Sequence, residues 1–304
     1  MQVKMLRGAG VWGRDDLASR TDWQGRFEGA NLLQIREELE SGPGVMRLSG
    51  FPIDQYDRDG AWTAFKGWCA QLGTLLSQNE KGETAFDVSN AGFADSDPRM
   101  RGPNTNKKLS FHTDRCDVIV FLCWRKAKAG GENELVSSMH LYNEIGKRRP
   151  ELLEILKQPF VYKRHTADLG NELPRCEQPI FSFQDGFFAC SFLRVLIDRA
   201  HADPELPDLS PTQIEALDFL EEVANEPGQS VRFLQEPGDV LLLNNWTILH
   251  RRTAFEDHEN REDRRRLLRI WLSMPNSRPI DPRFEANFGA TGAGELRGGF
   301  RVGG

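Results

Sequence analysis

Apolar residues at helical spacing mark five predicted helices along the chain. Two of them are followed by helix-stopping residues, Gly42-Pro43-Gly44 and Gly73. A third begins at Ser210-Pro211-Thr212-Gln213, a capping box with proline at the first helical position. Its Ile214, Leu217, Leu220 and Val223 are expected to share one buried face. The helices are predicted over residues 31–41, 61–72, 139–148, 151–157 and 210–225.

Strand-length apolar runs mark the other elements. Val118 to Trp124 is continuously apolar, which is typical of a strand buried on both faces. Asp185-Gly186 has the composition of a two-residue hairpin turn between residues 179–183 and 187–193. Further strands are predicted over residues 45–51, 85–89, 160–165, 231–234, 239–243 and 267–274.

The order of these elements predicts an α+β fold. Strands dominate the middle and the end of the chain, and helices occur early and near residue 210. This order indicates a mainly antiparallel sheet or barrel that helices cover on one side. We find no composition shift that would mark a boundary, so residues 1–304 are expected to form a single domain.

Composition narrows the class of protein. Of the 304 residues, 39% are hydrophobic and 28% charged, which is a globular balance, and the net charge of -6 disfavours a nucleic-acid binder. No apolar run approaches the roughly 18 residues of a membrane span, and the first residues lack the apolar core of a secretory signal. The five cysteines are odd in number and never in C-x-x-C spacing. A cytoplasmic protein without membrane or nucleic-acid partners is therefore expected, and its oligomeric state is not readable from the sequence.

Phe111-His112-Thr113-Asp114 is the first candidate for chemistry. Residues two apart in a strand point to the same face, so His112 and Asp114 can both face a barrel interior or leave a strand end on one side. An imidazole and a carboxylate on one face are two ligands for a divalent metal. The triplet alone is a weak signal, because such short patterns occur often by chance.

His250 is the second candidate. It ends a short predicted strand that follows a polar bend after residues 239–243, and it can reach the His112 strand if the sheet closes. Two histidines and one carboxylate form the facial triad of non-haem Fe(II) oxygenases, which leaves open coordination positions. The alternative is a core histidine bonded to a backbone carbonyl.

An arginine group follows His250. In a strand, Arg265, Leu267, Arg269 and Trp271 would share one face. An inward arginine is costly unless a carboxylate meets it, and that carboxylate can come from the protein or from a dicarboxylate co-substrate. A solvated run of charge is the alternative.

These motifs resemble those of the taurine dioxygenase-like (TauD/TfdA) family of Fe(II)- and 2-oxoglutarate-dependent oxygenases. The resemblance rests on His112-x-Asp114, the distal His250 and an arginine about fifteen positions later. Other segments are also similar to the family's pattern and occur in the same order: Gly44 to Phe51, Gly130-Gly131-Glu132, Pro237-Gly238-Asp239 and His250 to Phe255.

The resemblance implies a double-stranded β-helix (jelly-roll, cupin-like) core with flanking helices. It implies His112, Asp114 and His250 as Fe(II) ligands. In relatives, the first arginine of an Arg-x-x-x-Arg pair grips the far carboxylate of 2-oxoglutarate. Arg265 and Arg269 match that pair best, although Arg264 and Arg266 adjoin it and leave the register open.

One position departs from the pattern. Many relatives carry a threonine that helps to bind 2-oxoglutarate after the Gly-Gly-acidic turn, where this chain has Asn133. An amide can donate a hydrogen bond as a hydroxyl does, so we keep this role for Asn133.

The expected activity is an oxygenase that consumes Fe(II)-activated O2 and 2-oxoglutarate, releases succinate and CO2, and oxidises, most simply hydroxylates, an unactivated C–H of a small metabolite. A non-catalytic barrel of the same ancestry and a zinc-dependent hydrolase are the alternatives. The intact ligand set argues against the first, and the inward arginine against the second. The loops over residues 77–84 and 95–108 are expected to border the pocket, with Asn79, Arg101 and Asn104 as candidate substrate contacts.

Overall fold

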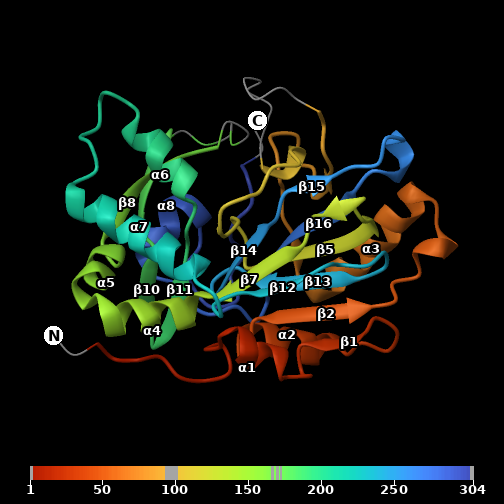
Figure 1. Cartoon of the computed structure of the whole chain (residues 1–304), viewed down its shortest axis with the longest axis horizontal. Helices are drawn as coiled ribbons and strands as arrows, with labels where there is room; N and C mark the ends of the chain where they lie inside the picture. Colours follow the sequence, from red (N-terminus) through yellow and green to blue (C-terminus); the bar gives the residue numbers. More distant parts are fainter. Residues whose placement is uncertain (1–2, 93–101, 166–167, 169–170, 172, 302–304) are drawn as a thin grey trace.

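A seven-stranded sheet forms the larger half of the protein's β-structure (Figure 1). The computed structural model describes residues 3–92, 102–165, 168, 171 and 173–301. The strands pair antiparallel except for β1 and β2, which are parallel. In sheet order they are β1 (Gln24–Arg26), β2 (Val45–Ser49), β13 (Val240–Asn244), β5 (Val118–Arg125), β16 (Arg266–Ser273) and β3 (Thr74–Leu75), and β4 (Ala85–Val88) also pairs with β16.

A three-stranded antiparallel sheet supplies the second β-layer. Its order is β12 (Val231–Phe233), β7 (Asn133–Ser137) and β14 (Ile248–Arg252). Three two-stranded pairs complete the β-structure: β6 (Ala129–Gly130) with β15 (Phe255–Glu256), β8 (Pro159–Lys163) with β9 (Arg175–Pro179), and β10 (Phe181–Gln184) with β11 (Phe187–Cys190). Asp185 and Gly186 between the last two have φ of 51° and 84°, which confirms the predicted two-residue turn.

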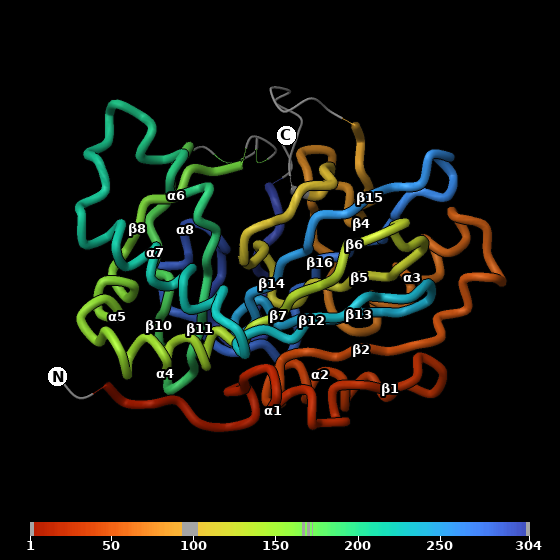
Figure 2. The backbone as a smooth tube through the Cα atoms, viewed as in Figure 1, coloured from red at the N-terminus to blue at the C-terminus, as the bar shows by residue number. Residues whose placement is uncertain are grey.

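Helices cover the outer faces of both sheets. The longer ones are α2 (Leu32–Glu40) and α3 (Arg58–Leu72) on the seven-stranded sheet, and α4 (Ser138–Arg148), α5 (Pro150–Leu156) and α7 (Pro211–Asn225), which pack together beside the three-stranded sheet. Shorter ones are α1 (Arg14–Ala18), α6 (Arg194–His201) and α8 (Glu285–Phe288), with 3-10 turns at Ile53–Gln55, Gly102–Asn104, Arg261–Asp263 and Pro282–Phe284. The N-terminal segment runs past both groups of helices (Figure 2), and the Leu6 N–H donates to Asn143 of α4.

Successive side chains of the central strands point alternately to the helix-covered core and to the space between the two sheets. On β5, Val118, Val120 and Leu122 pack under α2 and α3, whereas Ile119 and Phe121 face the space between the sheets. The two facing antiparallel sheets with helices outside are the predicted α+β architecture, a double-stranded β-helix core with flanking helices.

Three local expectations need correction. Helix α3 begins at Arg58 rather than Ala61, because the Asp57 side chain caps it by accepting the Gly60 N–H. Ile214 of α7 is 42% exposed, because at 100° per residue it lies off the stripe formed by Ala216, Leu217, Leu220, Val223 and Ala224. His250 lies in the middle of β14 rather than at its end, since the ladder with β7 continues to Arg252.

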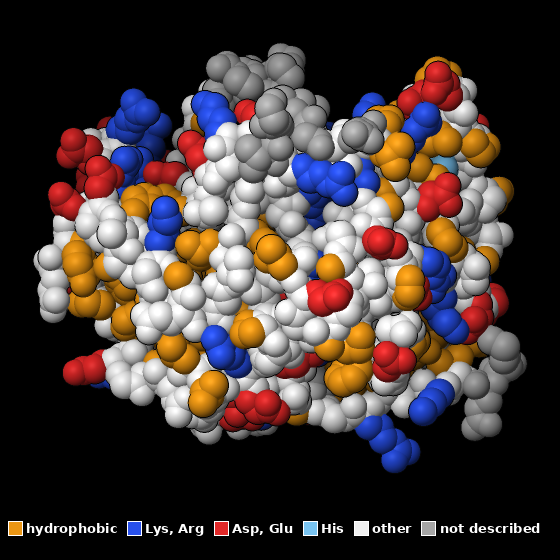
Figure 3. Space-filling model, turned by 180° about the vertical axis from the view of Figure 1, so that it is seen from behind, with side chains coloured by type: hydrophobic (Ala, Val, Ile, Leu, Met, Phe, Trp, Pro, Cys, Tyr) orange, Lys and Arg blue, Asp and Glu red, His pale blue; other side chains and the backbone are white. Residues whose placement is uncertain are grey.

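The surface carries charges of both signs. On the face opposite to that of Figure 1, Lys and Arg side chains are interspersed with Asp and Glu over the described residues (Figure 3). Within the described ranges, no helix has the length and apolar character needed to cross a membrane.

A buried ion pair ties the C-terminal segment to the start of β5. Arg297 Nε donates to Asp117 Oδ1 at 2.6 Å, and both side chains are almost completely buried. Asp117 also accepts from the Trp246 indole and from the Met274 N–H. The pair therefore joins β5, the turn before β14 and the end of β16.

Replacing Arg297 with alanine is expected to lower the free energy of unfolding by about 3–5 kcal/mol, because Asp117 would stay buried without a countercharge. Urea denaturation measures the change. Arg283→Ala, which removes a half-exposed partner of Asp281, is the control and is expected to cost less than about 1 kcal/mol. Equal losses in the two variants would contradict the account of the buried pair.

Candidate metal and co-substrate site

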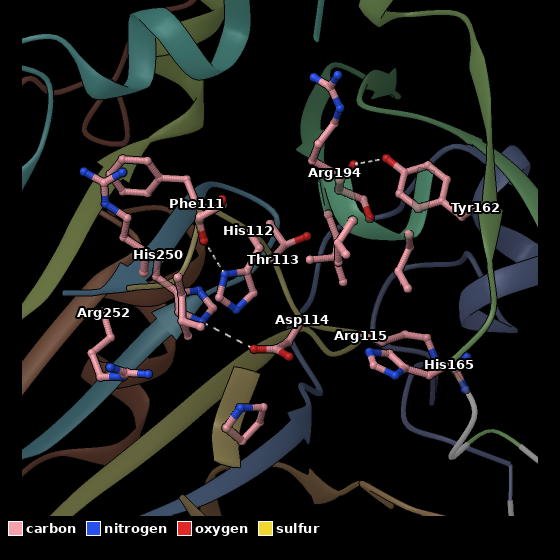
Figure 4. Close-up of a pocket in the computed structure, with 18 of the residues that line it drawn as sticks. Phe111, His112, Thr113, Asp114, Arg115, Tyr162, His165, Arg194, His250 and Arg252 are labelled. Atoms are coloured by element: carbon pink, nitrogen blue, oxygen red, sulfur yellow. Dashed lines mark hydrogen bonds and ion pairs between the residues drawn. The ribbon is translucent and has the colours of Figure 1, made fainter. Parts of the chain in front are cut away.

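His112 and His250 lie side by side although they are far apart in the sequence. Their backbones form an antiparallel bridge, in which each N–H donates to the other residue's carbonyl at 3.1 and 3.0 Å. Their ring centroids are 4.5 Å apart. The bridge extends the three-stranded sheet beside β14 and brings both imidazoles to the cavity between the sheets (Figure 4).

The orientation of His112 leaves one ring nitrogen available. Nδ1 lies 2.9 Å from the Ser110 carbonyl oxygen, so the proton of the neutral ring belongs on Nδ1. Burial, and next the neighbouring His250, lower the pKa of His112 to about 4. The ring is therefore neutral at pH 7 and presents the Nε2 lone pair that a metal requires.

Asp114 points toward the two rings (Figure 4). Its Oδ2 lies 3.4 Å from His250 Nε2, and its Oδ1 lies 3.9 Å from Arg269 Nη1. Burial raises the pKa of this carboxyl, but the His250 side chain and the charge of Arg269 outweigh it, and the pKa falls below its usual range. The carboxylate is therefore ionised.

The three side chains fit a single divalent ion. One ligand atom from each of His112, Asp114 and His250 lies within 4.8 Å of the others. Two ligands of one ion at bond lengths of about 2.0–2.2 Å can be up to about 4.4 Å apart, so the spacing needs little adjustment. Among the described residues, the buried Asp114 Oδ2 has no partner with hydrogen-bond geometry and lies 3.4 Å from His250 Nε2, which leaves this oxygen available to a shared ion.

Alternation on β16 decides which arginines reach the cavity. Arg265, Leu267, Arg269 and Trp271 line it, as predicted, whereas Leu268 and Ile270 pack under the helices. Arg266 faces away and pairs with Asp87 at 3.4 Å. Arg264 also points away, and its guanidinium donates to the carbonyls of His258 and Glu259.

Arg265 is a buried cation whose guanidinium forms no ion pair with the described residues. The residue is 4% exposed, and no carboxylate of the described chain lies within 4.0 Å of its guanidinium. Burial lowers its pKa to about 10, so it stays charged at pH 7. Only glycine fits beside it at position 131, where φ is +80° and a Cβ would lie 3.2 Å from Arg265 Nε. The Gly-Gly turn thus makes room for this guanidinium.

Arg252 is a second buried cation in the same wall. It donates to the carbonyls of Thr253 and Thr105 at 2.8 and 2.7 Å. Burial, and next the charge of Arg265, lower its pKa to about 9. Both guanidiniums contact the ring of Phe255, at 4.6 Å for Arg252 and 5.1 Å for Arg265. Two neighbouring buried cations favour an anionic ligand between the sheets.

Arg269 and Asn133 are held by partners within the protein. Arg269 Nε donates to Gln78 Oε1 at 2.7 Å, which orients the guanidinium toward Asp114. Asn133 opens β7, lines the cavity and donates through Nδ2 to Gln235 Oε1 at 3.1 Å. Its Nδ2 carries a second hydrogen that can serve a ligand.

Comparison with known proteins assigns the family. Residues 21–271 match the model of the taurine catabolism dioxygenase TauD, TfdA family. The chain belongs to the TauD/TfdA family. FR-33289 synthase from Streptomyces rubellomurinus is 31% identical over 281 residues, which is 90% of this chain and 80% of that protein. Human gamma-butyrobetaine dioxygenase is 25% identical over 50% of this chain and 41% of its own length.

Solved structures share the fold. An asparagine oxygenase in complex with Fe(II), a hydroxyasparagine and succinate covers 79% of each chain with a TM-score of 0.62 and 17% identity. The non-heme iron oxygenase OrfP, in complex with Fe and alpha-ketoglutaric acid, covers 80% of this chain and 79% of its own with a TM-score of 0.57 and 16% identity. This TauD-family protein is a 2-oxoglutarate-dependent dioxygenase that uses Fe(II) and O2, so the predicted family, enzyme class and cofactors are confirmed.

The cavity of this TauD-family dioxygenase extends well beyond the cluster of His112, Asp114 and His250. Its volume is about 730 Å³. One part is bounded by the two histidines, Asp114 and the arginines of β14 and β16. Another part is bounded by residues of β8, β9, α6 and α8, among them Tyr162, Gln178, Arg194 and Phe288. A co-substrate and a further small molecule can therefore be held together.

The candidate substrate residues lie apart from this cavity or outside the described chain. Asn79 holds its own loop together: its Oδ1 accepts from the Lys81 N–H and its Nδ2 donates to Glu83. Neither Asn79 nor Asn104 is among the described lining residues, although Pro103 and Thr105 are. Arg101 lies outside the described residues.

Sequence reasoning assigned no role to Gln78 or Arg252. Arg252 lies in the segment 250–255 that is similar to the family's pattern, but no sequence pattern shows that Gln78 reaches Arg269, 191 positions away.

Proposed function

We propose that His112, Asp114 and His250 are the Fe(II) ligands and that the protein hydroxylates a C–H bond of a small acidic molecule. The observation that carries this proposal is the convergence of two imidazole nitrogens and one ionised carboxylate within 4.8 Å, beside a buried arginine that forms no ion pair within the described chain. Two histidines and one carboxylate leave open positions for a chelating co-substrate and O2.

Held by His112, Asp114 and His250, Fe(II) would supply the activation of O2, which oxidises both 2-oxoglutarate, giving succinate and CO2, and a C–H bond of the substrate, with one oxygen atom going to each product. Arg265 would bind the far carboxylate of 2-oxoglutarate through charge-assisted hydrogen bonds. Asn133 donates a further hydrogen bond from β7. The apolar ring of Phe255 and the two sheets keep water from these charges, which strengthens their attraction for the co-substrate.

Charge balance supports an acidic substrate. The metal and the guanidiniums of Arg252, Arg265 and Arg269 carry more positive charge than Asp114, the nearby Asp257 and a dianionic co-substrate can neutralise. Other arginines of the cavity wall are already neutralised by protein carboxylates, such as Arg115 by Asp168 and Arg251 by Glu134, so the excess lies around the proposed metal and co-substrate positions. A buried excess of one charge is costly unless a ligand compensates it, so we propose a substrate that carries a carboxylate or another acidic group.

A turnover screen tests this function. Succinate formation is measured with Fe(II) and 2-oxoglutarate against matched acidic, neutral and basic small molecules of similar size. Acidic compounds are expected to stimulate succinate release, and Zn(II) in place of Fe(II) is expected to give none. Stimulation only by basic compounds would contradict the substrate class, and no Fe(II)-dependent succinate with any compound would contradict the site assignment.

A further inference from the structure

Asn245 clamps the segment that carries Asp114. It is 1% exposed and lies in the turn between β13 and β14. Its Oδ1 accepts the Asp114 N–H at 3.0 Å, its Nδ2 donates to Cys116 Sγ at 2.9 Å, and its own N–H donates to the Asp117 carbonyl at 2.9 Å. All three contacts are made to residues 114–117.

This segment needs such support because it belongs to no sheet. Residues 113–117 lie between the His112 bridge and the start of β5 and form neither helix nor strand. Thr113 is held by the backbone of Phe192, and the Asp117 N–H donates to the Leu272 carbonyl. The Asp114 N–H donates instead to the Asn245 side chain. That hydrogen bond replaces the ladder contact that a strand would provide.

The same turn leads to His250. Asn245 is followed by Trp246, whose indole donates to Asp117, and then by β14 with His250 at its centre. Asn245 therefore connects the segment of one proposed metal ligand with the strand of another. Its neighbour Asn244 is equally buried, but its side chain contacts none of residues 114–117: its Nδ2 donates to the Leu39 carbonyl at the end of α2, and its Oδ1 accepts the Trp246 N–H within the turn.

We propose that Asn245 is a positioning residue that fixes the Asp114 carboxylate for metal binding. This inference rests on the proposed function, in which Asp114 is a metal ligand. Groups that orient metal ligands commonly contribute a factor of about 10 to 100 to metal affinity, although they never touch the ion. Asn245 acts through the backbone of Asp114, and the cavity lining does not include it.

The test measures anaerobic Co(II) binding to the full chain by visible absorption and calorimetry, alongside the melting temperature. Asn245→Ala is expected to weaken Co(II) binding by about 10- to 100-fold. Asn244→Ala is the matched control, and it is expected to lower the melting temperature while keeping wild-type Co(II) affinity. Asn245→Asp keeps an oxygen that accepts the Asp114 N–H. Its Co(II) affinity is therefore expected to stay within tenfold of the wild-type value.

Three results would overturn the inference: unchanged Co(II) affinity in Asn245→Ala, equal losses of affinity in the Asn244 and Asn245 alanine variants, or a loss in Asn245→Asp as large as in Asn245→Ala. If Asn245→Ala does not fold, Asn245→Asp decides alone, and a tenfold or greater loss of affinity would overturn the inference. A wild-type protein that does not bind Co(II) would instead contradict the proposed metal site itself.

Discussion

Replacing His250 with alanine is expected to reduce 2-oxoglutarate-dependent succinate formation by at least about a thousandfold, which corresponds to about 4 kcal/mol of lost transition-state stabilisation. The physical reason is that His112 and Asp114 alone offer only two ligands, and the bridge between the two backbones does not depend on the imidazole of His250. Succinate release and metal content are measured together, and the circular-dichroism spectrum should match that of the wild type.

His201→Ala is the control for this variant. His201 lies on α6, outside the described cavity lining, and its Nδ1 contacts the Pro207 carbonyl. We expect this control to keep wild-type turnover. Full turnover in His250→Ala would show that the ligand assignment is wrong, because no third ligand would then be required from β14.

Replacing Arg265 with alanine is expected to raise the KM for 2-oxoglutarate by roughly 10- to 150-fold, because a charge-assisted hydrogen-bonding contact is worth about 1.5–3 kcal/mol. The metal affinity should change little, since Arg265 contacts none of the three metal side chains through a hydrogen bond or ion pair in the described structure. Initial rates at varied 2-oxoglutarate concentrations, with Fe(II) saturating, measure the effect.

Two neighbouring variants make this prediction specific to Arg265. Arg264→Ala removes a guanidinium that points away from the cavity, and its KM for 2-oxoglutarate should stay at the wild-type value. Arg269→Ala removes the neighbour of Asp114 and is expected to disturb substrate turnover more than co-substrate affinity. A co-substrate defect in Arg269→Ala but not in Arg265→Ala would reverse the roles of these two arginines.

Local patterns predicted most of the elements that build the site. The period of two grouped Arg265, which directly precedes β16, with Leu267, Arg269 and Trp271 of that strand, and all four line the cavity. The sequence left the choice among the neighbouring arginines open, and the structure turns Arg264 and Arg266 away from the cavity. The capping box at Ser210 and the turn at Asp185-Gly186 were also readable, because their geometry depends on neighbouring residues only.

Contacts between residues far apart in the sequence could not be predicted from these local patterns. Asn245 and Asp114 are separated by 131 positions, and their contact follows from the packing of an irregular segment against a turn. Likewise, the carbonyls that hold Arg252 come partly from Thr105, in a loop that no periodicity describes. Asn79 and Asn104 were predicted as substrate contacts because they lie in loops expected to border the pocket. The described cavity wall instead includes Pro103, Thr105 and residues of β8, β9 and α6.

The most direct test of the central claim is an anaerobic crystal structure with Fe(II) and 2-oxoglutarate. We predict a single iron bound by Nε2 of His112, a carboxylate oxygen of Asp114 and an imidazole nitrogen of His250, with the far carboxylate of 2-oxoglutarate on Arg265. Iron bound elsewhere, or bound without one of these three side chains, would contradict the account.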